Sequence, residues 1–189
     1  MSVDRDQRGY RAEPGPGPRV RCDVVDVYVA REAAPSTRAR DDDPRGAAAP
    51  AVIEVLQVRR AREPLKGSWQ PVMGHIEAGE LAPAAARREV MEEVALDVAS
   101  AACLGFWALE QVHPFYIAAI DCIVMSPRFL ARVDAQWEPR LNAEHTEHRW
   151  VDTRRAAEFF AWPGQHGAIT EVDAIVRGTS LGAVWTRLG

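Results

Sequence analysis

The segment GHIEAGELAPAAARREVMEEVAL at residues 74–96 carries a high density of acidic side chains. Three glutamates, Glu89, Glu92 and Glu93, fall within five positions. Several alanines and Pro83, which suits a first helical turn, indicate a helix, and residues three and four apart share one helix face. The three carboxylates would therefore crowd one side of the helix, where a like-charged pair costs about 0.2–0.5 kcal/mol.

An apolar arc lies beside the acidic one. Ala86, Val90 and Val94 fall at helical spacing and are typical of a face that packs on a sheet. A divalent cation would relieve the repulsion on the acidic side, and Mg²⁺ prefers hard oxygen ligands that it shares with water and substrate phosphates. We therefore expect a Mg²⁺ site, with Mn²⁺ as a substitute. For a pair of glutamates taken alone, a solvated acidic face is the favoured interpretation, and it is the spacing of the surrounding residues that favours the cation.

Composition and charge indicate an ordinary globular domain. The chain has 189 residues, 47% hydrophobic and 26% charged, and a formal net charge of −4. Such mild acidity gives no support for binding a nucleic acid polymer or a membrane. The apolar runs are short, no apolar signal core is visible near the N-terminus, and the three cysteines are far apart. We expect a cytoplasmic protein with reduced thiols.

Patterns outside the acidic segment predict one α+β domain over residues 20–178. Residues 1–19 are expected to be a flexible arm, 31–50 a loop insertion, and 179–189 a C-terminal tail. β-Branched or alternating segments predict strands at 20–30, 52–58, 68–74, 103–112, 115–125 and 147–152. Helices are predicted at 153–161, capped by Asp152 or Thr153, and at 166–178, with a break at 162–165 and a loop at 126–143.

The spacing within residues 74–96 strongly resembles the Nudix box, G-x5-E-x7-R-E-U-x-E-E-x-G-U, where U is a bulky aliphatic residue. The matching positions are Gly74, Glu80, Arg88, Glu89, Val90, Glu92, Glu93 and Leu96. Ala95 stands where the family has a glycine that helps the chain turn out of the helix. We expect this alanine to change the helix end without removing a metal ligand.

The resemblance implies a Nudix-type α/β/α sandwich, in which a mixed β-sheet is flanked by helices and the box forms a loop–helix–loop. By position, the metal-binding set would be Glu89, Glu92, Glu93 and Gly74. The catalytic set would be Glu93, Glu92, Arg88, Glu80 and Glu144. In these roles Arg88 orients the carboxylates by salt bridging, and Glu80 supports the loop.

Flanking segments are similar to the branch of the family that contains dihydroneopterin triphosphate pyrophosphatases. These segments are WQPVMGHIEAGE at 69–80, LNAEHTEHRWV at 141–151 and WPGQHGAI at 162–169. In that branch a glutamate before the penultimate strand reaches the metals, and Glu144 is the closest match, with Glu147 as the competitor. The general base is left open among Glu93, Glu144 and Glu147.

The implied function is a Mg²⁺-dependent pyrophosphohydrolase that cleaves a nucleoside triphosphate or dihydroneopterin triphosphate by attack of water. The alternatives are an ADP-ribose or dinucleoside polyphosphate hydrolase and a catalytically silent nucleotide-binding module. Trp69 is a candidate for stacking on a base or pterin ring or for the core, and Arg59 and Arg60 for phosphate contact or for an ordinary surface. The family also leaves a homodimer open.

Overall fold

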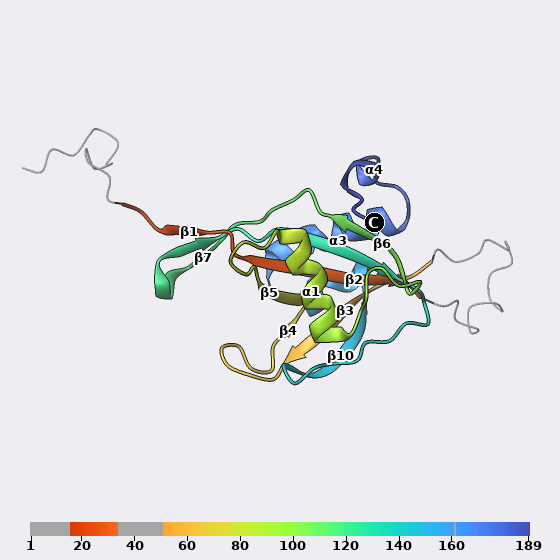
Figure 1. The fold of residues 1–189 in the computed structure, drawn as a ribbon, viewed down its shortest axis with the longest axis horizontal. Helices are drawn as coiled ribbons and strands as arrows, with labels where there is room; N and C mark the ends of the chain where they lie inside the picture. Colours follow the sequence, from red (N-terminus) through yellow and green to blue (C-terminus); the bar gives the residue numbers. More distant parts are fainter. Residues whose placement is uncertain (1–15, 34–50, 161) are drawn as a thin grey trace, which may run out of the picture.

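The computed structural model describes residues 16–33, 51–160 and 162–189. It has three layers: a seven-stranded sheet lies between helix α1 (Ala82–Val94) and helix α3 (Pro163–Val176) (Figure 1). The predicted α+β fold with a mixed sheet flanked by helices is confirmed. Most of the expected N-terminal arm and of the 31–50 loop lies outside the described residues.

The main sheet has the order β10-β3-β2-β9-β6. Its strands are β10 (His145–Asp152), β3 (Ile53–Arg60), β2 (Val24–Glu32), β9 (Arg128–Val133) and β6 (Cys103–Ala108). β2 and β9 are parallel and the other pairs are antiparallel. β2 and β3 pair only where Ala30–Glu32 meets Ile53–Val55, and they then diverge. The gap is filled by β4 (Trp69–Gln70), which pairs with β3, and β5 (Val72–His75), which pairs with β2.

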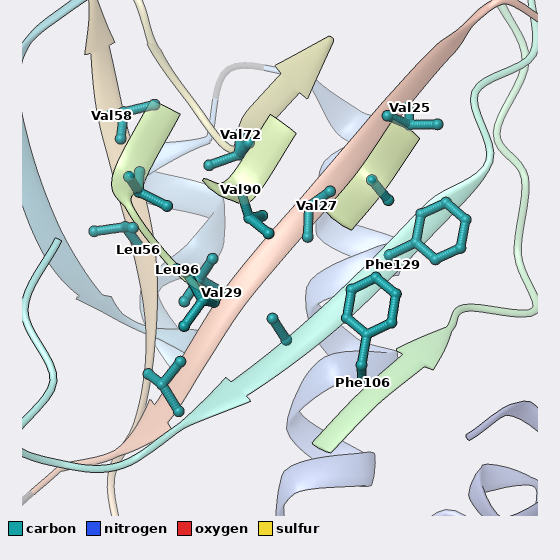
Figure 2. Close-up of a cluster of buried hydrophobic side chains, with 14 of the residues drawn as sticks. Val25, Val27, Val29, Leu56, Val58, Val72, Val90, Leu96, Phe106 and Phe129 are labelled. Atoms are coloured by element: carbon teal, nitrogen blue, oxygen red, sulfur yellow. The ribbon is translucent and has the colours of Figure 1, made fainter. Parts of the chain in front are cut away.

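Side chains of the sheet alternate between two apolar cores. On β2, Val25, Val27 and Val29 face α1, whereas Tyr28 and Ala30 face α3. The predicted apolar arc of α1 packs on the first core, which Figure 2 shows between the helix and the sheet. Burying a valine side chain fully contributes about 1.5–3 kcal/mol, so this face fixes α1 over the sheet.

The expected loop at 126–143 is wrong in part, because its residues 128–133 form the inner strand β9. The segment RFLARV carries two arginines where a buried strand usually has apolar side chains. The arginine at 128 lies 3.4 Å from Asp26 and also donates to the carbonyl oxygen of Gly164 at 2.7 Å. Buried charge can be tolerated when it is paired in this way.

The expected strand at 115–125 is interrupted. It consists of β7 (Phe115–Ile117), a 3-10 turn (Ala118–Ile120) and β8 (Cys122–Val124). Together with β1 (Arg19–Arg21), these strands form a small second sheet in the order β1-β8-β7, beside the main body (Figure 1). The expected strand at 103–112 ends earlier, at Ala108.

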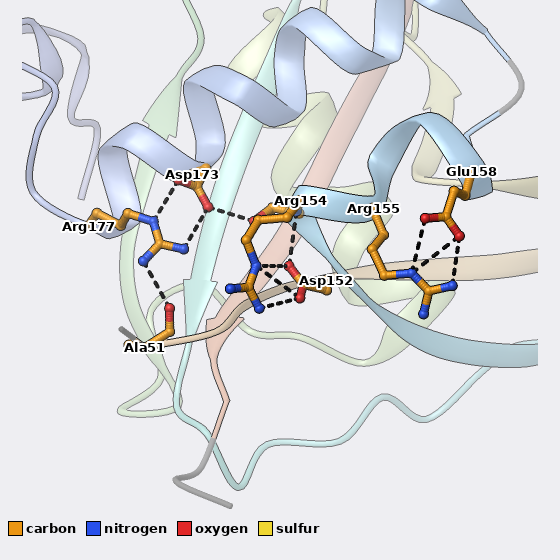
Figure 3. Close-up of polar contacts among 8 residues, drawn as sticks. Ala51, Asp152, Arg154, Arg155, Glu158, Asp173 and Arg177 are labelled. Carbon is orange, nitrogen blue, oxygen red and sulfur yellow. Dashed lines mark hydrogen bonds and ion pairs between the residues drawn. The ribbon is translucent and has the colours of Figure 1, made fainter. Parts of the chain in front are cut away.

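The C-terminal third also differs in detail from the sequence-based expectation. A 3-10 turn (Thr153–Arg155) leads into α2 (Ala156–Phe159), and the carboxylate of Asp152 caps it by accepting from the backbone N–H of Arg154 at 2.9 Å (Figure 3). The expected break between the two helices is present but shorter than 162–165, because α2 ends at Phe159 and α3 already begins at Pro163. Proline suits that first helical position, since its missing N–H has no partner there anyway.

The C-terminal tail packs on the domain. After α4 (Ala183–Thr186), the N–H of Leu188 donates to the carbonyl oxygen of Phe106 at 2.7 Å, and Phe106 donates to Gly189 at 2.8 Å. The Arg87 guanidinium on α1 donates to the carbonyl oxygen of Leu188 at 3.0 Å. The tail thereby links β6 to α1. Within the described ranges, no helix combines the length and the apolar character needed to cross a bilayer.

Candidate active site

Helix α1 carries the acidic residues beside its packed face. Glu89 and Glu93, one turn apart, are only 8% and 3% exposed, whereas Glu92 is exposed. The helix ends at Val94, and the next residue, Ala95, adopts the left-handed conformation (φ 58°) that the family's glycine would supply. The expected change of the helix end is therefore wrong: alanine accepts the same conformation, at an energetic cost.

Gly74 on β5 leaves the space that the Glu89 carboxyl group occupies. Gly74 pairs with Val25 and so lies on the face of the sheet that α1 covers. A Cβ atom added to Gly74 would overlap the carboxyl carbon and both carboxyl oxygens of Glu89. A side chain at this position would therefore push the carboxylate away from the strand.

Arg88 ties the helix to the loop that precedes it. Its Nε and Nη2 donate to the two carboxylate oxygens of Glu80 at 3.1 and 2.9 Å, and Nη2 also donates to the carbonyl oxygen of His75 at 2.8 Å. Its Nη1 donates to Oε1 of Glu89 at 2.8 Å and lies 3.5 Å from Glu92. The guanidinium of Arg88 lowers the pKa of Glu80. One cation thus gathers three carboxylates.

Glu93 has a different partner. Its Oε2 lies 2.7 Å from Nε2 of His145 at the start of β10, and both side chains are almost inaccessible to solvent. Burial raises the pKa of Glu93. His145 was not among the residues that the sequence nominated. Histidine spacing gave no motif, and the only available signal was its place directly after Glu144.

Glu144 and Glu147 lie in different surroundings. Burial raises the pKa of Glu89, and the negative charges of Glu92 and Glu144 raise it further, so Glu144 lies near the carboxylates of α1. Glu147 instead forms an ion pair with Arg59 at 2.6 Å. Because Val58 packs in the core beneath α1, its neighbour Arg59 and the paired Glu147 face the opposite side of the sheet.

The nominated substrate-binding residues do not lie together. Trp69 pairs with Arg59 across β4 and β3, and its ring stacks on the Arg149 guanidinium at 4.1 Å. The other aromatic neighbour of that guanidinium is Phe159 at 4.8 Å, so this group lies on the face opposite α1. Arg60 is the next residue of β3, so its side chain lies on the α1 face, and it is paired with the histidine at 145 across the two strands.

The acidic side chains near α1 are of the kind that binds a divalent cation, although they are not arranged around one common point. In the part of the chain that the structure describes, no group of three or more His, Cys, Asp or Glu side chains is arranged to hold a metal. Glu89 is held by an arginine, Glu93 by a histidine, and Glu92 and Glu144 are exposed. All four supply the oxygen ligands that Mg²⁺ prefers. They are the residues that could hold the ion.

The fold and this site define a class: an α/β/α domain whose acidic helix is backed by a glycine in the sheet. More specifically, the chain belongs to the NUDIX domain family, whose sequence profile matches residues 42–171. This match confirms the resemblance drawn from residues 74–96. It also confirms the predicted class, Nudix hydrolase, at the level of the family.

Two known proteins are similar to parts of this chain. An octanoyltransferase from Myxococcus xanthus is 34% identical over 122 residues, 64% of this chain and 32% of the relative. A dihydroneopterin triphosphate diphosphatase from Escherichia coli (strain K12) is 52% identical over 44 residues, 23% of this chain and 28% of the relative. The chain thus matches about a third of the length of these relatives.

A solved structure agrees over a longer stretch. The crystal structure of a Caenorhabditis elegans Ap4A hydrolase binary complex superposes with a TM-score of 0.59 at 18% identity. The similarity covers 82% of this chain and 97% of that one. At this identity the likeness establishes the fold.

Proposed function

We propose that the chain is a Mg²⁺-dependent pyrophosphohydrolase that cleaves a phosphoanhydride bond of a nucleotide-like polyphosphate by attack of water. The observation that supports this most is the arrangement of the acidic helix: Arg88 and His145 hold Glu89 and Glu93 one turn apart, Glu92 is exposed between them, and Glu144 directly precedes His145. A polyphosphate is also anionic. A divalent cation is therefore the component that both sides require.

Each side chain has a proposed task. The four carboxylates would hold the cation, which when bound neutralises phosphate charge and lowers the pKa of a water molecule. Arg88 keeps Glu89 and the loop residue Glu80 in place through the hydrogen bonds described above. Glu93 or Glu144 accepts the proton of the attacking water. Glu147 is the weaker candidate for this base, because it is paired with Arg59 on the other face of the sheet.

The proposed substrate is a nucleoside triphosphate or dihydroneopterin triphosphate. Support for the pterin compound is the 52% identity to the diphosphatase named for it, over 44 residues. A dinucleoside polyphosphate is the second candidate, favoured by the overall similarity to an Ap4A hydrolase. A cytoplasmic location, a homodimer and the domain boundaries stay predictions.

A substrate panel tests the proposal. Release of phosphate, with added pyrophosphatase, is measured for dihydroneopterin triphosphate, dNTPs, Ap4A and ADP-ribose in the presence of Mg²⁺ and of EDTA. We expect Mg²⁺-dependent turnover that is fastest with a triphosphate. Glu93→Gln should lower kcat by about 10²–10⁴-fold. Glu158→Gln is the control, because this exposed carboxylate on α2 pairs, among the described residues, only with Arg155 of the preceding 3-10 turn.

Two results would contradict the proposal. Turnover by Glu93→Gln at the wild-type rate would remove the assigned role of that carboxylate. Fastest turnover with Ap4A or ADP-ribose would replace the triphosphate substrate while leaving the hydrolytic class intact.

A further inference from the structure

The loop before β10 is fixed to the end of α1. The backbone N–H groups of Arg140 and Asn142 donate to the carbonyl oxygens of Val94 and Glu93 at 3.0 and 3.1 Å. Carbonyl groups in the last turn of a helix have no partner within the helix, so these two bonds satisfy them. The chain is therefore anchored beside the acidic helix just before it reaches His145.

A β-bulge then turns His145 toward α1. The register between β10 and β3 shifts between His145 and Glu147, so that Thr146 is an extra residue. In a regular strand, with Thr146 paired instead of bulged, alternation would place His145 on the same face as Glu147, which pairs with Arg59 on the side opposite α1. Bulges commonly re-aim a side chain next to an active site. Here the bulge brings an imidazole to a carboxylate of the acidic helix.

The two carboxylate oxygens of Glu93 have different surroundings. Oε2 lies 2.7 Å from Nε2 of His145, with 4% of the Glu93 side chain and 2% of the histidine side chain exposed. Oε1 makes no hydrogen bond among the described residues, and it is not one of the inaccessible polar atoms without a partner. It therefore stays within reach of solvent. Oε2 of Glu93 is thus held by His145, whereas Oε1 remains accessible to a ligand.

The surroundings of Nδ1 indicate which ring nitrogen of His145 carries the hydrogen. Nδ1 of His145 is inaccessible and has no hydrogen-bond partner within the described ranges. A buried lone pair is tolerated better without a partner than a buried N–H group. We therefore assign the hydrogen to Nε2, which donates it to Glu93.

We propose that His145 is a positioning residue: by holding Oε2 of Glu93, it presents Oε1 as a fixed oxygen to the divalent cation and the attacking water. The inference rests on the proposed function of the same site. It adds a residue that makes no contact with the reacting atoms itself and acts through Glu93. Residues that orient metal-binding side chains in this way typically affect metal affinity or activity about 10–100-fold.

The test compares side chains that differ in their reach toward Glu93. In His145→Gln the amide nitrogen can reach the place of Nε2, in His145→Asn it falls one methylene short, and His145→Leu has no donor. His148→Leu is the matched control, since this histidine of the same strand contacts Glu138 at 3.4 Å. Three properties are measured on the full chain: Mn²⁺ affinity of the substrate-free protein by electron paramagnetic resonance, kcat and KM on the best substrate, and Tm in EDTA.

We expect His145→Leu and His145→Asn to weaken Mn²⁺ binding and lower kcat about 10–100-fold, with KM within about threefold of wild type. His145→Gln should restore both to within about fivefold of wild type, and His148→Leu should leave both unchanged. In the Glu93→Gln background, His145→Leu should cause no further loss of kcat, because two residues that act as a unit are not additive.

Two outcomes would overturn the inference: a folded His145→Leu with wild-type Mn²⁺ affinity and kcat, or equal losses in His145→Gln and His145→Asn, which would mark a purely structural role. If the Tm shows that His145→Leu does not fold, the Mn²⁺ affinity and kcat of His145→Gln, compared with those of His145→Asn, decide whether His145 positions Glu93. If the wild-type chain hydrolyses no polyphosphate, the proposed function fails. The Mn²⁺ affinities still decide whether His145 positions Glu93.

Discussion

At Gly74, the absence of a single carbon atom determines where a carboxylate lies. The Glu89 carboxyl group occupies the volume that a Cβ atom would need, and Arg88 holds it there from the other side. The neighbour that would clash is the far end of a flexible side chain. A substitution at Gly74 would therefore be relieved by rotation of Glu89, with little disturbance of the strand.

Gly74→Ala should consequently impair the site more than the fold. We expect Mn²⁺ affinity and kcat to fall about 10–100-fold, because Glu89 leaves its place, with a loss of stability below about 1 kcal/mol. Gly182→Ala is the control: no atom lies within 4 Å of the added Cβ, and φ is −78°. Wild-type affinity and turnover in Gly74→Ala, measured as for the His145 variants, would contradict this account.

At the level of elements, the end of α1 is under strain. Ala95 has φ 58° and donates its N–H to Met91 at 3.2 Å, while Leu96 donates to Val90 at 3.0 Å, so both cap bonds form around a left-handed alanine. A residue with a Cβ atom pays about 1–2 kcal/mol for this conformation, and glycine does not.

Ala95→Gly should therefore stabilise the protein. The relief of strain is partly offset by the greater chain entropy of glycine in the unfolded state, about 0.4–1 kcal/mol, which leaves a gain of about 0.5–1 kcal/mol in the free energy of unfolding. Ala84→Gly, at an exposed position inside the same helix, should instead lose about 0.5–1 kcal/mol. Urea denaturation measures both, and a loss of stability in Ala95→Gly would refute the strain.

The cap at the end of β10 gives a pH-dependent prediction. Hydrogen bonds from Arg154 lower the pKa of Asp152, so its folded pKa lies below the unfolded value near 3.9 (Figure 3). The ionised carboxylate therefore contributes stability above that unfolded pKa, and the contribution is lost as the pH falls through the folded pKa. Asp152→Ala should cost about 1 kcal/mol at pH 7.

Asp152→Asn separates the charge of this cap from its hydrogen bond, because asparagine caps a helix as well as aspartate does. The difference in the free energy of unfolding between wild type and Asp152→Asn should shrink as the pH is lowered below about 4. Chemical denaturation at pH 7, 4 and 3 measures this difference. A constant difference across that range would contradict the assigned ionisation.

Over the whole molecule, one buried ion pair joins three elements. Arg128 on β9 lies 3.4 Å from Asp26 on β2 and donates to the carbonyl oxygen of Gly164 in α3, and the side chains of Arg128 and Asp26 are 4% and 6% exposed. Ser126 donates to the same carboxylate at 3.0 Å. Burial raises the pKa of Asp26, so the carboxylate depends on these partners to remain charged.

Arg128→Met should lose about 3–5 kcal/mol, because the buried Asp26 then loses its cation and the carbonyl oxygen of Gly164 loses its donor. Replacing both residues, in Asp26→Leu/Arg128→Met, should cost clearly less than the sum of the two single changes, since no charge is then left buried. Urea denaturation of the wild type, the two single variants and the double variant measures the coupling energy between the two residues. Additive losses would show that the pair is not coupled.

The sequence predicted the parts that short-range spacing encodes and missed those that tertiary contacts create. The spacing from Gly74 to Leu96 predicted the acidic helix, its apolar face and the family. Strand β9 was missed because the charge of Arg128 is neutralised by a residue about a hundred positions away. His145 was missed because its direction depends on a bulge, which a one-dimensional pattern does not reveal.

The segment β4–β5, which fills the gap between β2 and β3, connects to β3 through the largely exposed turn at residues 61–68. Changing the length of an exposed turn costs little free energy. Residues can therefore be added or removed there while Gly74, paired with β2, keeps its place under Glu89. Variants lengthened within the exposed residues 62–66 should therefore keep the fold, provided Ala61 stays in place, because its N–H donates to the carbonyl oxygen of Glu144 at 2.7 Å.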